Sequence, residues 1–550
     1  MLVAPNSTLR NVLFLISDDF RPSSGAYGNE FARTPNLDRL ASEGTLFTAA
    51  HVQFAYCAPS RNSFMSGRRP DATKAYNFLN HFRETGVGDQ WVALPELFKN
   101  AGFLVTGANK LYHEGLPPNF DLPKSWSAEG PSGEDWPYVD SVHQDKFSCD
   151  HTNLSFVDDD RFCLTTPAPG KQLTDEGAAE LVASRLTEAI DNWNATGQPF
   201  FVGLGTHKPH LVWEYPRHFF DSIASDVAEA AHQAWPAEVP HLGWHECAEM
   251  SHPYWDDNGW GVPPSTADFS GHQSLMRRAY YGCLMYTDHV FGRVLDVLEK
   301  SSAAARTATI FMGDHGWHLG EHDLWCKMTN RETGTRVPLI IRAPWLHAQR
   351  AGTAGGVARG LAEAVDLYPT LAELAGVALP TGAAGAYLGG TSLVPLLLDP
   401  THGRVKDVVL AQFPRCWQNN THHPSGSKPG DENNRTSSWE TMSDCHWTER
   451  AYIDFMGYKM RTETMAITQW LVWDGAKLRP DWEKPVGLEL YDHTGDTGMA
   501  PAAFDDFENV NLAGRPEYAQ VQAQLLARLR KEVEKWMTPN PASSETLVEL

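Results

Sequence analysis

Cys57 has the most distinctive chemical surroundings of any residue in this chain. It opens the run Cys57-Ala58-Pro59-Ser60-Arg61, and a helical pattern follows that Gly67 is placed to end. A group at Cys57 would therefore lie at a helix N-terminus, where anions are favoured. Arg61, one helical turn further on, would lie beside it. The competing interpretation is a buried structural thiol, which is the commoner fate of a free cysteine.

Acidic side chains follow two strand-like runs that are far apart in the sequence. Asp18-Asp19 comes directly after the apolar run Asn11–Ser17, and Asp314-His315 comes just after Thr307–Met312. Adjacent buried carboxylates repel each other, so a bound cation is the usual remedy. One such pair alone would favour a solvated turn, but two at strand ends favour a metal site. Aspartate oxygens suit a hard cation such as calcium, although His315 is a less usual calcium ligand and leaves other metals open.

Strand-like and helix-like segments alternate over the first 400 residues, which predicts an α/β fold with a large, mostly parallel sheet flanked by helices. Ligands of such sheets bind beyond the carboxyl ends of the strands, so the segments that follow them, including His207–His210, should converge. The predicted strands are Asn11–Ser17, Gly102–Thr106, Pro199–Gly205, Thr307–Met312 and Val337–Ile341, and the predicted helices are Asn36–Ala41, Leu94–Ala101, Thr174–Asn192, Gln273–Lys300 and Val365–Ala375.

The pattern changes near residue 400, where strands follow one another with few helices between them. We predict a smaller antiparallel sheet and one helix, formed by Val408–Phe413, Ala451–Arg461, Thr464–Trp473, Leu488–Tyr491 and Glu517–Trp536. We therefore expect two domains, residues 1–400 and residues 401–550. A polar, turn-rich insertion near 415–447 reads as a long loop.

The formal net charge of −23 disfavours a nucleic-acid partner. No apolar stretch is long enough to span a bilayer, and residues 1–10 lack the pattern of a secretory leader. The chain is thus expected to be cytoplasmic, or a mature extracytoplasmic form. Five glycosylation sequons, at Asn6, Asn153, Asn194, Asn419 and Asn434, lend weak support to the second option. The cysteine pairs Cys149/Cys163 and Cys416/Cys445 bracket loop-like segments, and either disulfides or reduced thiols would fit them.

The motif C-x-P-S-R at Cys57, followed by G-R-R-P, resembles the signature of the sulfatase family. The resemblance runs from Asn11 to about Ala513 through the stretches SDDFRPSSGAYG, CAPSRNSFMSGRRPD, GANKLYH, THKPHLVWEYP, GDHGWHLGEHDLWCK, VDLYPTLAELAG and FMGYKMRT. It implies a sandwich like that of alkaline phosphatase and the hydrolysis of sulfate esters. It also implies a disulfide between Cys149 and Cys163.

The resemblance implies a role for each matching residue. A formylglycine-generating enzyme would oxidise Cys57 to formylglycine (3-oxoalanine), whose gem-diol form is the nucleophile. One calcium ion would be bound by the modified residue together with Asp18, Asp19, Asp314 and His315. Arg61 would hold the nucleophile, and Lys327 would bind the sulfate. Lys110 and His113 would contact the sulfate and the nucleophile region, and His210, in preference to His207, would lie close to the leaving oxygen.

These roles agree with the chemistry of a sulfate ester. Its sulfur is attacked readily only when the sulfate oxygens are neutralised, which a metal and lysines can do. A histidine or lysine can protonate the departing alcohol. A serine or an unmodified thiol lacks the second hydroxyl of the gem-diol, which explains the need for a modified cysteine.

The resemblance further implies a substrate: a chain-terminal uronic acid that carries a 2-O-sulfate, within a glycosaminoglycan or similar polysaccharide. A carboxylated sugar needs a second cationic contact, from Lys208, Arg68, Arg69 or a residue of the insertion. Trp317 is a further candidate for the pocket. The alternatives are another sulfated polysaccharide or small sulfate ester, a phosphonate or phosphate monoester, and a catalytically silent binding protein. With a leader removed, the protein would be secreted or lysosomal.

Overall fold

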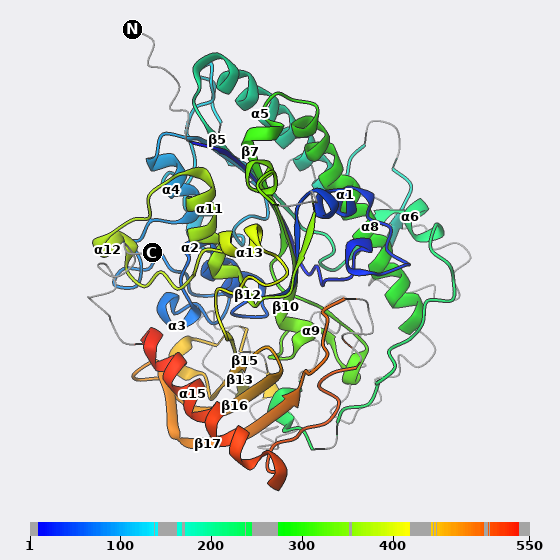
Figure 1. Ribbon diagram of the computed structural model, residues 1–550, viewed down its shortest axis with the longest axis vertical. Coiled ribbons are helices and arrows are strands. Elements are labelled where there is room, and N and C mark those ends of the chain that lie inside the picture. The colour runs from blue at the N-terminus through cyan, green and yellow to red at the C-terminus, as the bar shows by residue number, and fades with distance from the viewer. Residues whose placement is uncertain are drawn as a thin grey trace, which may run out of the picture.

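A computed structural model of the 550-residue chain describes residues 9–136, 138–140, 162–167, 171–236, 238–244, 273–350, 355–417, 442–443, 445–446, 448–499, 504 and 506–537. Figure 1 shows a large sheet flanked by helices, and below it a smaller sheet with one long helix. The part of the insertion at 418–441, Cys149, and the sequons at Asn6, Asn153, Asn419 and Asn434 lie outside the described residues.

The large sheet has eight strands in the order β11-β2-β10-β7-β1-β5-β3, with β12 also paired to β2. The strand β10 is antiparallel to both of its neighbours, and every other pairing is parallel. The prediction of a mostly parallel sheet is therefore confirmed. The strands are β1 (Asn11–Ser17), β2 (Thr45–His51), β3 (Leu104–Asn109), β5 (Phe200–Thr206), β7 (Thr307–Gly313), β10 (Arg336–Arg342), β11 (Gly356–Ala358) and β12 (Ala362–Glu363).

Both faces of the large sheet are covered, which is why its central strands are mostly apolar on both faces. In β1, Leu13 and Leu15 belong to one core with α1, α5 and α8. The residues that alternate with them, Val12, Phe14 and Ile16, pack into a second core with α2, α4 and α11 (Figure 1). These helices are α1 (Pro35–Glu43), α2 (Cys57–Ser66), α4 (Leu94–Asn100), α5 (Thr174–Thr196), α8 (Gln273–Glu299) and α11 (Leu367–Ala375).

The smaller sheet is antiparallel throughout, in the order β14-β13-β15-β16-β17. Its strands are β13 (Val409–Trp417), β14 (Met442–Ser443), β15 (Phe455–Arg461), β16 (Met465–Asp474) and β17 (Arg479–Asp492). The helix α15 (Ala519–Met537) buries Leu525, Leu529 and Val533 against it. The predicted sheet and helix are thus present, and the domain boundary at residue 400 stays a prediction.

Short elements complete the described fold. Two small ladders pair β4 (Phe162–Thr165) with β6 (Trp213–Pro216) and β8 (His318–Leu319) with β9 (Trp325–Cys326). The short helices are α3 (Pro70–Thr73), α6 (Arg217–Asp221), α9 (Glu332–Thr335), α10 (Pro344–His347), α12 (Gly382–Gly385) and α13 (Val394–Leu398). Among the described helices, none combines the length and apolar composition needed to cross a membrane.

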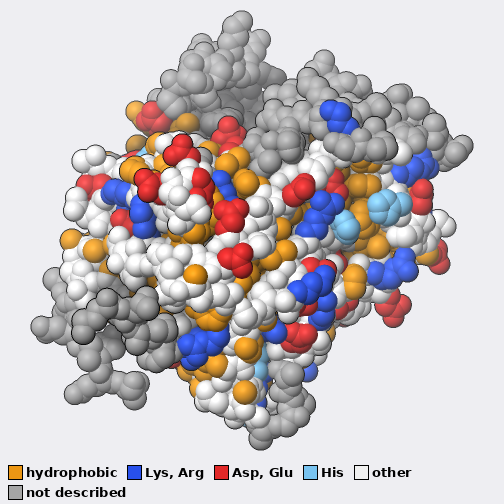
Figure 2. Space-filling view, turned by 90° about the horizontal axis from the view of Figure 1, so that it is seen from above, with side chains coloured by type: hydrophobic (Ala, Val, Ile, Leu, Met, Phe, Trp, Pro, Cys, Tyr) orange, Lys and Arg blue, Asp and Glu red, His pale blue; other side chains and the backbone are white. Residues whose placement is uncertain are grey.

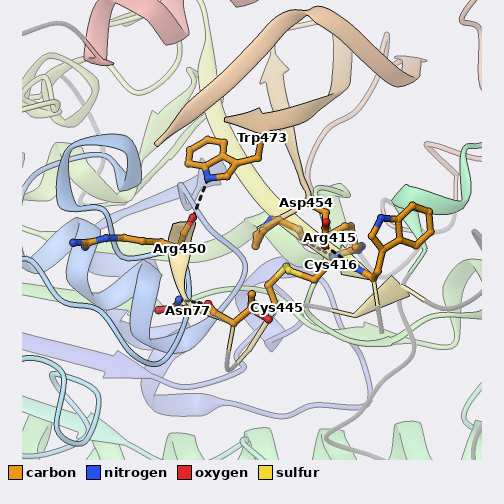
Figure 3. The surroundings of a disulfide bond; sticks show 10 residues. Asn77, Arg415, Cys416, Cys445, Arg450, Asp454 and Trp473 are labelled. Carbon is orange, nitrogen blue, oxygen red and sulfur yellow. Dashed lines mark hydrogen bonds between the residues drawn. A yellow bond between two sulfur atoms is a disulfide. The ribbon is translucent and has the colours of Figure 1, made fainter. Parts of the chain in front are cut away.

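Cys416 and Cys445 form a disulfide, with their Cα atoms 5.3 Å apart. Figure 3 shows that it joins the end of β13 to the segment that leads into β15. Cys163 and Cys326 also each take part in a disulfide, with a partner outside the described residues. Among the described residues, Cys57 and Cys283 are free, and both are buried.

A buried network of charges lies where the two sheets meet. Glu332, in α9, contacts Arg336 at 2.7 Å and Lys459 Nζ of β15 at 2.8 Å. Lys459 Nζ lies 3.3 Å from Glu508, on the other side. The His51 imidazole adds a third contact to Glu332, at 2.9 Å. The network ties the end of β2 to the smaller sheet.

Candidate active site

Adjacent parallel strands bring the predicted site residues to one edge of the large sheet. The strands β3, β5, β1 and β7 are neighbours and run in the same direction. Asp18-Asp19 follows β1, Asp314-His315 follows β7, Lys110 follows β3 and His207–His210 follows β5. The carboxyl ends of the strands therefore gather segments that are nearly 300 residues apart, since the Asp19 amide donates to Asp314 Oδ1 at 3.1 Å.

Cys57 is the first residue of α2, as predicted. Tyr56 is extended before it, and Pro59 is tolerated because the amide groups of a first helical turn have no intrahelical acceptor. The helix ends at Gly67, whose φ of 71° is left-handed and whose amide donates to Phe64 and Ser63. The Cys57 side chain thus lies at the positive end of a ten-residue helix.

The Cys57 thiol lies in a cluster of metal-ligand types. It donates to Asp18 Oδ1 at 3.3 Å, and His315 Nε2 lies 3.3 Å from its sulfur. The ligand atoms of Asp18, Cys57, Asp314 and His315 all lie within 4.8 Å of one another, and all four side chains are buried. Asp19 borders this cluster, with its Oδ1 3.4 Å from His315 Nδ1.

Chemically, this donor set fits a divalent cation. Three buried carboxylates are close enough to repel one another, and burial raises the pKa of Asp314 to about 7 despite the opposing charge of Arg61. Burial and the charge of Lys327 hold the pKa of His315 well below its ordinary value, so its imidazole is neutral and able to bind metal. Oxygen-rich sites of this kind suit a hard cation.

Three cations surround the carboxylates. Arg61 Nε donates to Asp314 Oδ2 at 2.9 Å, and the same guanidinium donates to the Lys110 and Leu111 carbonyls. The Lys110 ammonium contacts Asp18, and Lys327 Nζ donates to Asp19 Oδ1 at 2.8 Å. Burial opposes charge on Lys110, but Asp18 raises its pKa above the ordinary value, so the ammonium stays charged. Within a chain whose net charge is −23, the site thus holds one cation for each of its three carboxylates.

The predicted histidines lie at the rim of this cluster and are half-buried. His210 Nδ1 donates to the Leu211 carbonyl at 2.6 Å, which makes Nε2 the acceptor nitrogen of the neutral ring. Burial, with Lys327 and Lys110, holds the pKa of His210 well below its ordinary value. Burial and Lys110 lower the pKa of His113 to about 3. His207 lies beside Lys208 on the same loop, and burial lowers its pKa as well.

The secondary pocket candidates have other roles. Arg68 donates to the backbone carbonyls of Val92, Ala384 and Ala386, and Arg69 forms a bidentate pair with Glu363 at 2.8 and 2.6 Å. The expectation that either arginine could hold a substrate carboxylate is therefore wrong, because both are buried against these partners. Lys208 Nζ donates to the His210 and Val212 carbonyls at 3.1 and 2.7 Å, and Trp317 is buried with Lys327 Nζ 5.2 Å from its ring centre.

Asp175 is a site residue that the sequence did not reveal. Its carboxylate accepts from the His207 and Lys208 amides at 2.9 Å each and from Asn109 Nδ2 at 2.6 Å. It thereby fixes the loop after β5 against the end of β3. Its place in the first turn of a predicted helix indicated only a favourable N-terminal charge.

A sequence model of the family described as "Sulfatase" matches residues 10–377, about two thirds of the chain. The chain belongs to the sulfatase family. Iduronate 2-sulfatase of Mus musculus is 30% identical to this sulfatase over 543 residues, which cover 91% of this chain and 92% of that protein. The expected resemblance is thus confirmed, and the activity class is hydrolysis of a sulfate ester.

Solved structures agree on the fold of this sulfatase. One described as a 2-O GAG sulfatase has a TM-score of 0.64 at 19% identity and covers 96% of this chain, with 92% of its own chain matched. Phosphonate monoester hydrolase SpPMH from Silicibacter pomeroyi has a TM-score of 0.61 at 18% identity, with 97% of each chain covered. At these identities the likeness shows the shared alkaline-phosphatase-like fold alone.

Proposed function

We propose that this sulfatase removes the 2-O-sulfate from a terminal uronic acid, with formylglycine made from Cys57 as nucleophile and one calcium ion as cofactor. The observation that carries the proposal is the position of Cys57, at the start of α2 and 3.3 Å from both Asp18 and His315. The uronate preference is supported by the likeness to iduronate 2-sulfatase over 91% of the chain.

The two groups that the family implies would act from the cluster around Cys57. When present, formylglycine supplies the nucleophilic hydroxyl and the cation polarises the sulfate oxygens. Asp18, Asp19, Asp314 and His315 would hold the cation, and the Cys57 sulfur marks where the nucleophilic oxygen would stand. Three carboxylates favour calcium, while His315 keeps other divalent cations open.

The residues of the chain would divide the remaining work. Lys110 and Lys327 would bind sulfate oxygens, exchanging part of their contact with Asp18 and Asp19 for the substrate. Arg61, held by Asp314 and two backbone carbonyls, would orient the nucleophile. His113 would contact the sulfate and nucleophile region. A bound sulfate would add negative charge beside His210 and so favour uptake of a proton from solvent at Nε2, and the imidazolium would then give this proton to the leaving oxygen.

An exo-acting enzyme is the proposed mode. A long polyanion would meet the field of a chain with a net charge of −23, although salt screens that field beyond about 8 Å. A single terminal residue needs only the cationic pocket around Cys57. The substrate would therefore enter as a chain end.

We also propose that the protein works in an oxidising compartment, secreted or lysosomal. The Cys416–Cys445 disulfide and the disulfide-bonded Cys163 and Cys326 support this, because such bonds are rare in the cytosol. Of the five sequons, Asn194 lies on the surface near the end of α5, where a glycan could be attached.

Mass spectrometry of the peptide that contains Cys57 tests the nucleophile, in a chain produced with a formylglycine-generating enzyme. We expect formylglycine there and an intact thiol at Cys283, the matched buried cysteine. Fully active protein that carries only unmodified Cys57 would refute the proposal. A phosphonate monoester as substrate tests the alternative that the SpPMH fold suggests, since turnover faster than on an aryl sulfate would favour it.

The substrate is tested by kcat/KM on a 2-O-sulfated uronate disaccharide, a 6-O-sulfated hexosamine and an aryl sulfate. We expect the uronate to be preferred. Equal or higher values on the other two would reject the uronate while leaving the sulfatase activity in place. No turnover on any sulfate ester would instead favour a silent binding protein.

A further inference from the structure

The proposed pocket needs a wall for the sugar ring, and its cations do not provide one. Lys110, Lys327 and Arg61 contact the metal-site carboxylates, and Lys208 binds carbonyls of its own loop. These cations are therefore placed to bind the sulfate group or backbone carbonyls, and not the sugar ring. The sugar to which the sulfate is attached must lie further out, against half-buried side chains.

An aromatic group lies next to the pocket. The Phe78 ring is 4.7 Å from His113 and 4.3 Å from the ring of His446. Tyr56, directly before Cys57, packs against both, at 4.5 Å from Phe78 and 5.3 Å from His446. Lys327 Nζ lies 5.9 Å from the Tyr56 ring centre. Phe78, His113 and His446 are half-buried, whereas Tyr56 is fully buried.

Hydrogen bonds fix the His446 ring in this place. The Tyr56 hydroxyl lies 2.5 Å from His446 Nδ1, and the Phe78 amide donates to the His446 carbonyl at 3.3 Å. Tyr56 and His446 are 390 residues apart in the chain. His446 belongs to the segment that leads into β15 of the smaller sheet. Through this contact it reaches the edge of the large sheet where Cys57 lies.

The Cys416–Cys445 disulfide anchors that segment immediately before His446. Figure 3 shows the bond between β13 and the chain that continues to Arg450. Asn77, next to Phe78, donates to the Thr448 carbonyl at 2.6 Å, and the Arg450 carbonyl accepts from Trp473 at 2.9 Å. The disulfide and the Trp473 hydrogen bond thus hold the His446 segment to the smaller sheet, and the Asn77 hydrogen bond holds it against the Phe78 segment.

We propose that His446 and Phe78 form the wall that recognises the sugar ring of the substrate, with the His446 imidazole contacting its carboxylate. The inference rests on the proposed function and deepens it. An aromatic ring packs against the apolar face of a sugar, and an imidazole can donate to a carboxylate. The contact lies beyond the sulfate-binding cations, so it affects which ester binds and not the cleavage of the S–O bond.

The test compares His446→Ala with wild type on the sulfated uronate disaccharide and on an aryl sulfate. We expect kcat/KM on the disaccharide to fall by about tenfold to a hundredfold, mainly through a higher KM, because a hydrogen bond to a charged group is lost. On the aryl sulfate the change should stay within about twofold. His402→Ala, at a side chain that is 83% exposed, is the matched control.

Two further variants separate recognition from folding. Phe78→Leu should raise KM for the disaccharide in the same way. The double variant Cys416→Ser/Cys445→Ser should do so too, because it releases the segment that carries His446. Equal losses on both substrates in all three variants would overturn the inference, as would an unchanged KM for the disaccharide in His446→Ala.

Failure of the substrate proposal is distinguishable from failure of this inference. If wild type prefers another sulfated sugar, the uronate assignment fails, and the ratio of variant to wild type on that sugar still decides the role of His446. A sulfatase that hydrolyses aryl sulfates but no sulfated sugar would overturn both.

Discussion

Cys57 lies at the centre of the proposed metal and substrate site. Its sulfur contacts Asp18 and His315, and burial and the negative charge of Asp18 raise the pKa of the thiol well above its ordinary value. An unmodified Cys57 is therefore a neutral thiol, and a poor nucleophile. This agrees with a function that requires its chemical conversion.

Replacement of Cys57 by serine should remove nearly all activity, by about a thousandfold or more in kcat, since serine offers one hydroxyl in place of two. The fold should survive, because serine fits the same helix position. Aryl sulfatase assays and thermal unfolding of Cys57→Ser, beside Cys283→Ala, measure the two effects. Substantial turnover by the serine variant would contradict the proposed nucleophile.

Asp314→Ala should abolish both metal binding and turnover. Asp314 accepts from Arg61 Nε and from the Asp19 amide, so its loss removes a proposed metal ligand and the anchor of two neighbours. Elemental analysis of the purified variant, with the exposed Asp399→Ala as control, gives the metal content. A full complement of metal in Asp314→Ala would show that the cation is bound elsewhere in the protein. Zinc in the wild-type protein would correct the proposed identity of the metal.

At the scale of elements, the strand β5 is shaped to bring Lys110 close. A Cβ atom on Gly205 would stand 2.1 Å from the Lys110 carbonyl oxygen, whereas one on Gly203 of the same strand would meet only the Leu111 side chain, at 2.6 Å. The end of a side chain can move aside to make room for a Cβ atom, whereas the backbone of a packed segment cannot do so easily.

Gly205→Ala should therefore lower kcat by about tenfold or more, because displacement of Lys110 moves a proposed sulfate-binding group. Gly203→Ala should have a milder effect on kcat. The measurement is steady-state kinetics on an aryl sulfate for both variants. If the two variants lose the same activity, the close approach at Gly205 has no special role.

The sequence predicted the elements that carry strong local signals. The runs Asn11–Ser17 and Thr307–Met312 are largely apolar because both faces of β1 and β7 are buried, and the residues after them could be placed at a strand end. The strand β2 was not predicted, since TLFTAAH has neither alternation nor a long apolar run. The strand β17 begins at Arg479, nine residues before the predicted start, in a polar stretch that pairs only with β16 at the sheet edge.

The structure brings together the candidate residues that stood in motifs, Asp18, Asp314 and Cys57, while their roles stay predictions. Asp175 and His446 could not be singled out from the sequence, because their hydrogen-bond partners are supplied only by the fold. Arg68 and Arg69 carried the charge expected of a substrate contact. Their actual partners, backbone carbonyls and Glu363, could not be read from the sequence.

At the scale of the whole molecule, positive and negative side chains are mixed on the surface and do not form a large patch of one sign on the face in Figure 2. On the face in Figure 2, Lys and Arg side chains are interspersed with Asp and Glu side chains. The buried charges are organised differently, in paired sets such as the network around Glu332. That network joins the two sheets and is far less screened by solvent.

Lys459→Met tests this network. The change leaves Glu332 and Glu508 without their shared cation, and we expect a loss of about 3–5 kcal/mol in the free energy of unfolding. Lys477→Met, which breaks an exposed pair with Asp474, should cost at most about 1 kcal/mol. Urea unfolding of both variants checks the difference, and equal midpoints would argue against a stabilising network.

The burial of Cys57 also determines when, relative to folding, its side chain can be modified. Its side chain is 1% exposed in the folded protein, and its contacts come from Asp18, before it, and from His315, 258 residues after it. A second enzyme cannot reach a side chain enclosed in this way. The proposed conversion must therefore precede the arrival of β7, while the segment around Cys57 is still an open nascent chain. The speed of synthesis and of folding would then set what fraction of the molecules ever becomes competent, and a chain that folded too early would stay inactive for good.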